Sequence, residues 1–310
     1  MNNVTKKKYT PLPSHLILCV NALLAVFFIV DLLVNIPSAL VSVLYIVVFL
    51  LPCAAYILLR GKGIYKTFNK LHLPPTASAL MVVYTAAAII CFSLLYSFLP
   101  CFQEIENSFS IYDIYIGENN GMLNTALVLI SFVLLPAVCE EFMFRGILCA
   151  EFQTYGMIGS ITLSTFFFAI IHFNFKFIPV YIFAGIMLSL LMYATKSLYA
   201  AVLVHLLYNL FGFYGQPSLT SLYEATGSTA MFVLLLLVLL IISLILFCGK
   251  AIKFYFSYSE RAAENKMKII DKTFRSPRII FTEILNFLRT PTALISIVIY
   301  IIAASLNLVL

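Results

Sequence analysis

The sequence predicts an all-α fold, a polytopic transmembrane helical bundle of eight to nine spans, and three observations support it. The chain is 63% hydrophobic and only 10% charged, whereas soluble domains are about 25% charged. Its mean hydropathy is +1.04. Its apolar runs have about the 17 to 25 residues that a helix needs to cross a bilayer, and they lack the alternation typical of a membrane barrel.

The predicted spans follow one another with short connections over most of the chain. Three of them, the sixth, seventh and ninth, are short, which leaves eight or nine as the expected count. The nine apolar runs lie at 16–36, 40–59, 79–100, 122–144, 157–174, 178–195, 198–214, 230–248 and 292–310.

The basic residues predict how the chain is oriented. The first run follows Lys6, Lys7 and Lys8 and lacks a small-residue cleavage site, so we expect it to remain as an anchor. With the N-terminus in the cytoplasm and nine spans, every Lys and Arg except Lys176 lies on the cytoplasmic side. We therefore expect an integral multi-pass protein, in the plasma membrane if the source is prokaryotic. The net charge of +6 belongs to these loops and does not call for a nucleic-acid partner.

The chain divides into three predicted parts. Residues 1–121 hold three N-terminal spans, and residues 122–215 hold four spans that carry the polar motifs described below. Residues 216–310 hold the C-terminal spans and a basic amphipathic segment, 249–291, on the cytoplasmic side. We expect that segment to lie along the inner headgroups, where each Lys or Arg contributes about 1 kcal/mol towards anionic lipid.

Two adjacent carboxylates, Glu140 and Glu141, stand in an apolar run. An ionisable residue inside a span indicates a functional site. Adjacent helical residues point about 100° apart, so the two carboxylates cannot both face one small ligand. Glu141 and Arg145 are four residues apart, the spacing of an ion pair, which leaves Glu140 as the reacting group. Pro136, one turn earlier, is expected to disturb the helix beside them.

Two histidines follow on later apolar runs. Phe168 and His172 share one helix face, as do His205 and Asn209. Depth along antiparallel helices places Glu140 and His172 at similar heights, and His205 matches them if the turn near residue 155 extends about 10 Å further into the cytoplasm. A carboxylate, imidazoles and an amide are what peptide hydrolysis needs, as a base for water and as donors to the oxyanion.

The same Glu140, His172 and His205 also form a plausible three-ligand zinc set with an open fourth position. The sequence leaves open whether the site binds zinc or works without metal. The helical zinc-protease motif with two histidines four residues apart is absent from the chain.

Three motifs on successive apolar segments carry a resemblance to a known family. They are Glu140-Glu141-x-x-x-Arg145-Gly146, Phe168-x-x-x-His172 and His205-x-x-x-Asn209. In this order they resemble the CPBP family of intramembrane proteases, which is related to the type II CAAX prenyl endopeptidases and is also called the Abi family.

The resemblance implies a role for each motif residue. Glu140 with His172 would activate water, and His205 with Asn209 would hold the oxyanion. Glu141, Arg145 and Phe168 would shape the site. The four spans of 122–215 would form the catalytic core, and the substrates would be C-terminal tails of lipidated proteins or other membrane-associated peptides. The family is commonly called a metalloprotease family, although a metal-free glutamate mechanism has been argued for it.

Two other functions remain open. The carboxylates and histidines can serve as the proton relay of a proton-coupled transporter. A non-catalytic immunity or scaffold protein can keep the same residues for packing. Replacing Glu140 with glutamine separates catalysis from packing, because the change is nearly isosteric.

Overall fold

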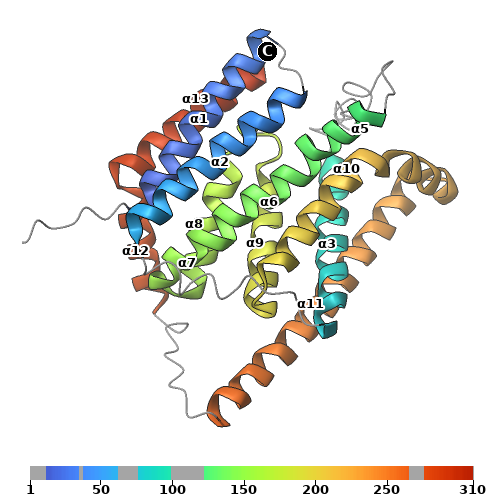
Figure 1. Cartoon of the computed structure of the whole chain (residues 1–310). Helices are drawn as coiled ribbons and strands as arrows, with labels where there is room; N and C mark the ends of the chain where they lie inside the picture. The colour runs from blue at the N-terminus through green and yellow to red at the C-terminus, as the bar shows by residue number, and fades with distance from the viewer. Residues whose placement is uncertain (1–11, 35–37, 62–75, 99–121, 265–275, 310) are drawn as a thin grey trace, which may run out of the picture.

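The computed structural model describes residues 12–34, 38–61, 76–98, 122–264 and 276–309 (Figure 1). Every regular element within these ranges is helical. The N-terminal lysines and the connection 101–121 lie outside the described residues. The prediction of an all-α bundle is confirmed.

The transmembrane part consists of long helices and of one rod made from several short helical segments. The long helices are α1 (Pro13–Val34), α2 (Ser38–Arg60), α3 (Ala79–Ser97), α8 (Gly156–Ile170), α9 (Ile178–Thr195), α10 (Leu198–Thr226), α11 (Thr229–Glu264) and α13 (Pro291–Val309). The composite rod contains α5 (Met122–Leu129), η4 (Ile130–Leu134), α6 (Leu135–Glu141), η5 (Phe142–Leu148), α7 (Cys149–Glu151) and η6 (Phe152–Tyr155). The remaining elements are the short η2 (Thr76–Ser78) and α12 (Pro277–Leu288).

Eight stretches of the described residues are long and apolar enough to cross a membrane. The longest, Thr125–Ile170, has 46 residues and covers most of two predicted runs, 122–144 and 157–174. The chain reverses inside it at Gly156, whose φ of 81° is a left-handed conformation that favours glycine. The return helix α8 has 15 residues, which is about 22 Å of helix and shorter than a bilayer core of about 30 Å.

Serine hydroxyls tie the two halves of this stretch together. Ser160 Oγ donates to the carbonyl of Cys149 at 2.6 Å, and Ser164 Oγ donates to that of Phe144 at 3.0 Å. Later residues of α8 thus meet earlier residues of the composite rod, as antiparallel packing requires. Interhelical hydrogen bonds from small polar residues are typical of helix contacts in membranes.

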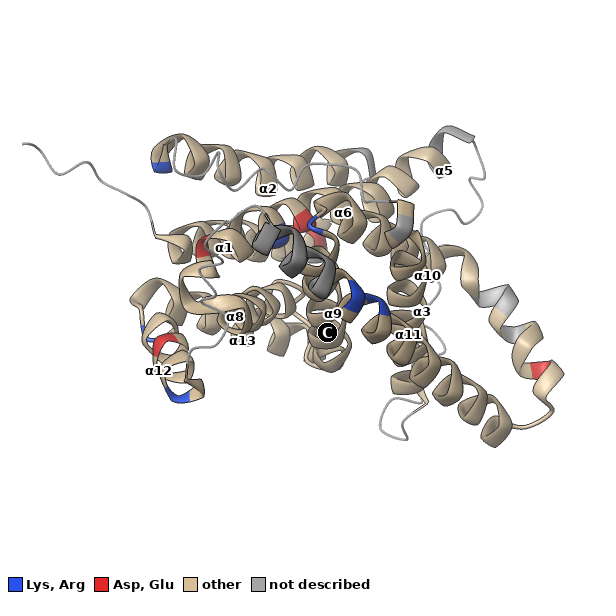
Figure 2. Ribbon diagram, turned by 90° about the horizontal axis from the view of Figure 1, so that it is seen from below, with Lys and Arg blue, Asp and Glu red and all other residues tan. Residues whose placement is uncertain are grey.

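The composite rod is packed between helices from all parts of the chain. α6 contacts α2 and α10, while α8 packs on η5 and on α9. α8 and α9 approach closely at Gly185, where an added Cβ would lie 2.8 Å from Cγ2 of Thr165. Charged residues are sparse along the described helices (Figure 2), so Glu140 and Glu141 of α6 lie in apolar surroundings.

The structure describes the basic segment 249–291 in two parts, before and after residues 265–275. Residues up to Glu264 continue α11 as one helix of 36 residues, because the helical pattern is not interrupted where the apolar run ends. α12 is the only helix described in the remainder of the segment. Its Phe287 is buried and packs edge-on against Phe152 and Phe167, so this helix contacts the bundle through its apolar face.

Candidate active site

The helix that carries the two glutamates is irregular on both sides of them. α6 contains Glu140 and Glu141 and lies between two π-helical segments, η4 and η5. A π-helical turn is rare and is often found at functional sites. The disturbance expected at Pro136 is therefore present as the π-helical turn just before it. Side chains of neighbouring helices bond carbonyls in both segments, including that of Val133 in η4.

Glu140 is buried, with 4% of its surface exposed. Its Oε1 accepts a hydrogen bond from the hydroxyl of Tyr45 on α2. Its Oε2 lies 3.7 Å from Nε2 of His172 and forms no hydrogen bond with the described residues. One oxygen of the carboxylate is thus held by α2, and the other faces the imidazole.

His172 follows the end of α8 and is fixed by two contacts. Its Nδ1 lies 2.8 Å from the carbonyl of Phe168. Because a carbonyl only accepts, Nδ1 carries a proton, and Nε2 is the ring nitrogen that faces Glu140. The ring of Tyr181 on α9 stacks on the imidazole with 3.9 Å between centroids. These contacts set both the tautomer and the direction of the ring.

Glu141 and Arg145 form a fully buried ion pair, with neither side chain exposed and 2.7 Å between Nη1 and Oε1. Arg145 Nη2 also donates to the carbonyl of Gly185 at 3.2 Å. The guanidinium lies over the ring of Phe168, 4.3 Å from its centroid. The ion pair expected from the spacing is present, and it joins the composite rod to α8 and α9.

His205 pairs with Glu141 and not with Glu140. Its Nδ1 lies 2.9 Å from the Glu141 Oε1 that also accepts from Arg145. A carboxylate adjoining Arg145 only accepts, so Nδ1 carries a proton here as well. Asn209, one turn further along α10, donates from Nδ2 to the carbonyl of Val133 at 3.3 Å.

Phe168 stands between the two carboxylate–histidine pairs. Its ring meets the imidazole of His172 at 4.9 Å and that of His205 at 6.0 Å between centroids, both in edge-on arrangements. Aromatic rings prefer this geometry. Six of the seven residues predicted for the site are therefore joined by contacts, and the seventh, Asn209, lies one turn from His205 on α10 and bonds Val133.

The residues expected as zinc ligands are not brought together as a set of three. In the part of the chain that the structure describes, no group of three His, Cys, Asp or Glu side chains is placed to hold a metal ion. The reason is the pairing, because His172 faces Glu140 while His205 is bonded to Glu141. In this arrangement the side chains do not fit a three-ligand zinc site.

The site is also contacted by two tyrosines that the sequence did not indicate. Tyr45 bonds Glu140 from a helix 95 residues earlier, and Tyr181 stacks on His172. Both stand in apolar runs without a motif, where a tyrosine is an ordinary core residue. Only the packing of α2 and α9 against the composite rod shows their positions.

Comparison with known proteins finds one family model and one relative that this chain resembles. The family model described as type II CAAX prenyl endopeptidase Rce1-like matches residues 122–211. The chain is also similar to the membrane-embedded CAAX protease MroQ of Staphylococcus aureus, with 29% identity over 151 residues. That alignment covers 44% of this chain and 61% of the length of the relative. No solved structure matches the chain.

The matched range 122–211 contains every predicted site residue. Among the described residues, eight stretches are long and apolar enough to span a membrane. The chain is thus an integral, multi-pass membrane protein, and its relative is membrane-embedded by name. Over residues 122–211 the chain is similar to the type II CAAX prenyl endopeptidases, and the relative that it matches is a CAAX protease.

Proposed function

We propose that the chain is an intramembrane endopeptidase that hydrolyses a peptide bond near the cytoplasmic membrane face, with water activated by Glu140 and His172. The observation that supports this most strongly is the pairing of the two side chains, 3.7 Å apart between Oε2 and Nε2. Glu140 lies in α6 and is buried, whereas the side chain of His172, just after the end of α8, is 22% exposed. The match of residues 122–211 to the type II CAAX prenyl endopeptidase model supports the proposal.

The two facing atoms suit a single water molecule. Glu140 Oε2 and His172 Nε2 are both acceptors, so they do not bond each other, and a water can donate one O–H to each. As that water attacks the carbonyl carbon, Glu140 takes its proton and then delivers it to the leaving amine. His172 orients the water through the second O–H. General base catalysis of this kind contributes about 10²- to 10⁴-fold to the rate.

His205 and Asn209 supply the donors for the oxyanion in this proposal. With its Nδ1–H bonded to Glu141, the imidazole of His205 can donate from Nε2 only in its doubly protonated form, and that form would hold the oxyanion. Asn209 uses one amide hydrogen for Val133 and has a second one free for the substrate. Such donors act strongly in a buried site because they are oriented before the reaction begins.

The substrates we propose are C-terminal tails of lipidated proteins or other membrane-associated peptides. We propose that the enzyme lies in the membrane with its N-terminus in the cytoplasm. Only Lys176 of the basic residues falls outside in that orientation. In a prokaryote the membrane would be the plasma membrane. The test is cleavage of a library of prenylated and unmodified peptides by the purified protein in liposomes, read by mass spectrometry. Products that appear with the wild type but not with Glu140→Gln support the proposal.

Tyr45→Phe is expected to lower kcat by about tenfold or more and to leave KM nearly unchanged, because the hydroxyl holds Glu140 and not the substrate. A hydrogen bond to a charged group is worth about 1.5–3 kcal/mol. Phenylalanine keeps the stacking on Phe49, whose centroid lies 4.8 Å away. Kinetics in the Glu140→Gln background should show no further loss.

The matched control is Tyr300→Phe. The hydroxyl of Tyr300 is buried and bonds none of the described residues. This variant should retain wild-type kcat. An equal loss in both variants, or a further loss from Tyr45→Phe in the Glu140→Gln background, would assign Tyr45 a purely structural part.

Dialysis against a chelator is expected to leave peptide cleavage unchanged, because the donors at the site are paired as two separate couples. Elemental analysis of the purified protein should find well under one zinc per chain. Cleavage that is lost on dialysis and restored by zinc would show instead that Glu140, His172 and His205 rearrange around a metal.

A further inference from the structure

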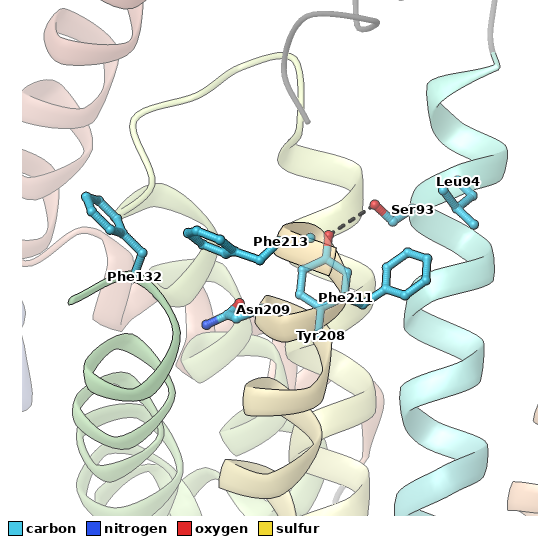
Figure 3. A pocket seen from close by; sticks show the side chains of 8 residues that line it. Ser93, Leu94, Phe132, Tyr208, Asn209, Phe211 and Phe213 are labelled. Carbon is cyan, nitrogen blue, oxygen red and sulfur yellow. Dashed lines mark hydrogen bonds between the residues drawn. The ribbon is translucent and has the colours of Figure 1, made fainter. Parts of the chain in front are cut away.

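A cavity of about 200 Å³ opens between α3, η4 and α10, beside the proposed oxyanion donors (Figure 3). Its walls include Ser93 of α3, Phe132 of η4, and Tyr208, Asn209 and Phe213 of α10. Figure 3 shows Asn209 and Phe213 extending from α10 towards Phe132.

Two elements of the catalytic cluster, α10 and the composite rod, also form walls of the cavity. Asn209 lines it, and His205 lies one turn earlier on α10, about 6 Å along the helix axis. Phe132 also lines it, and the next residue, Val133, accepts the hydrogen bond of Asn209. A peptide whose carbonyl oxygen meets His205 and Asn209 therefore has a neighbouring side chain within reach of the cavity.

The lining favours an apolar occupant. Its aromatic rings dominate the surface, and its two hydroxyls bond each other, with 3.0 Å between Ser93 Oγ and the Tyr208 hydroxyl. Because one hydroxyl donates to the other, at most one O–H of this pair is left for a ligand. Asn209 is the one amide in the wall, and it lies on the side shared with the active site.

The size of the cavity selects a single side chain. An apolar cavity of about 150 Å³ holds one benzene molecule, whereas sites for larger ligands have about 300–1,000 Å³. A volume near 200 Å³ thus fits one large aliphatic or aromatic side chain and is too small for a whole lipid chain. We propose that this cavity binds a large apolar side chain of the peptide substrate next to the scissile bond, an inference that rests on the proposed function.

Gly212 provides a test that fills the cavity without disturbing the helix. It lines the cavity, and a Cβ added to it meets nothing within 4 Å. Gly212→Leu should therefore place a side chain in the free space, and Gly212→Ala should fill it less. Gly249 on α11 also has nothing within 4 Å of an added Cβ and does not line the cavity, so Gly249→Leu is the matched control.

The experiment measures kcat/KM for peptides that differ only in the residues flanking the cleaved bond, with Phe, Leu, Ala or Gly at each position. The wild type and Gly249→Leu should prefer Phe or Leu at one position. Gly212→Leu should cleave those peptides about 10- to 200-fold less well while retaining the Ala and Gly peptides, since pocket contacts discriminate on this scale. Gly212→Ala should fall between them.

An unchanged preference in Gly212→Leu, or an equal loss for every peptide, would overturn the proposal that the cavity is a subsite. Neither result would contradict the proposed endopeptidase function. Binding of the same peptides to Glu140→Gln, with and without Gly212→Leu, does not depend on turnover. Tighter binding of the Phe peptide that Gly212→Leu removes supports the subsite even if no peptide is cleaved. Equal binding of all peptides to both proteins would overturn it.

Discussion

Glu140→Gln is expected to lower kcat/KM for peptide cleavage by about 10²- to 10⁴-fold, because the amide cannot take a proton from water. The change keeps the shape of the side chain and an oxygen that can accept from Tyr45. Kinetics of the purified variant in liposomes give the measurement. The melting temperature in detergent should stay close to that of the wild type, since no charged partner is left alone.

Glu151→Gln is the matched control for this variant. Glu151 lies on the same composite rod and pairs with Arg60 at 3.1 Å, away from the histidines. It should cleave at the wild-type rate. Full activity in Glu140→Gln would mean that Glu140 is kept for packing, and would favour the non-catalytic scaffold over the protease.

Arg145→Met is expected to destabilise the protein by about 3–5 kcal/mol, because it leaves the carboxylate of Glu141 buried without its compensating charge. The same change removes the bond to Gly185 and the contact with Phe168, which tie the composite rod to α8 and α9. The free energy of unfolding in mixed detergent micelles measures the effect.

Two further variants show whether the buried charge is the cause. Arg60→Met breaks the partly exposed pair with Glu151 and should cost at most about 1 kcal/mol. Adding Glu141→Gln to Arg145→Met should recover part of the lost stability, because no unpaired charge remains. If the double variant is less stable than Arg145→Met alone, the loss of stability comes from packing and hydrogen bonds and not from the unpaired carboxylate of Glu141.

Much of the bundle was predictable because bilayer-length apolar runs can fold only as helices. The ion pair of Glu141 and Arg145 followed from their spacing of four residues, a local property of one helix. The end of α8 at Ile170, just before His172, did not follow, since the apolar run continues past it. Length and periodicity thus indicated where the rods lie but not where each one ends.

The contacts between helices could not be predicted from the sequence. Whether His205 faces Glu140 or Glu141 depends on how α10 is rotated against α6, and both rotations keep an apolar face towards lipid. The structure selects Glu141. The hydrogen bond of Tyr45 to Glu140 depends in the same way on the register of α2 against α6. Such choices rest on side-chain packing between segments far apart in the sequence.

The most direct test of the shared water is a double-mutant cycle on kcat/KM with Glu140→Gln and His172→Ala. Residues that act on one reacting group as a unit show strongly non-additive losses. We therefore expect the double variant to cleave peptide about as slowly as the worse single variant. Losses that multiply, with the double variant slower by the product of the two single effects, would contradict joint activation of one water by Glu140 and His172.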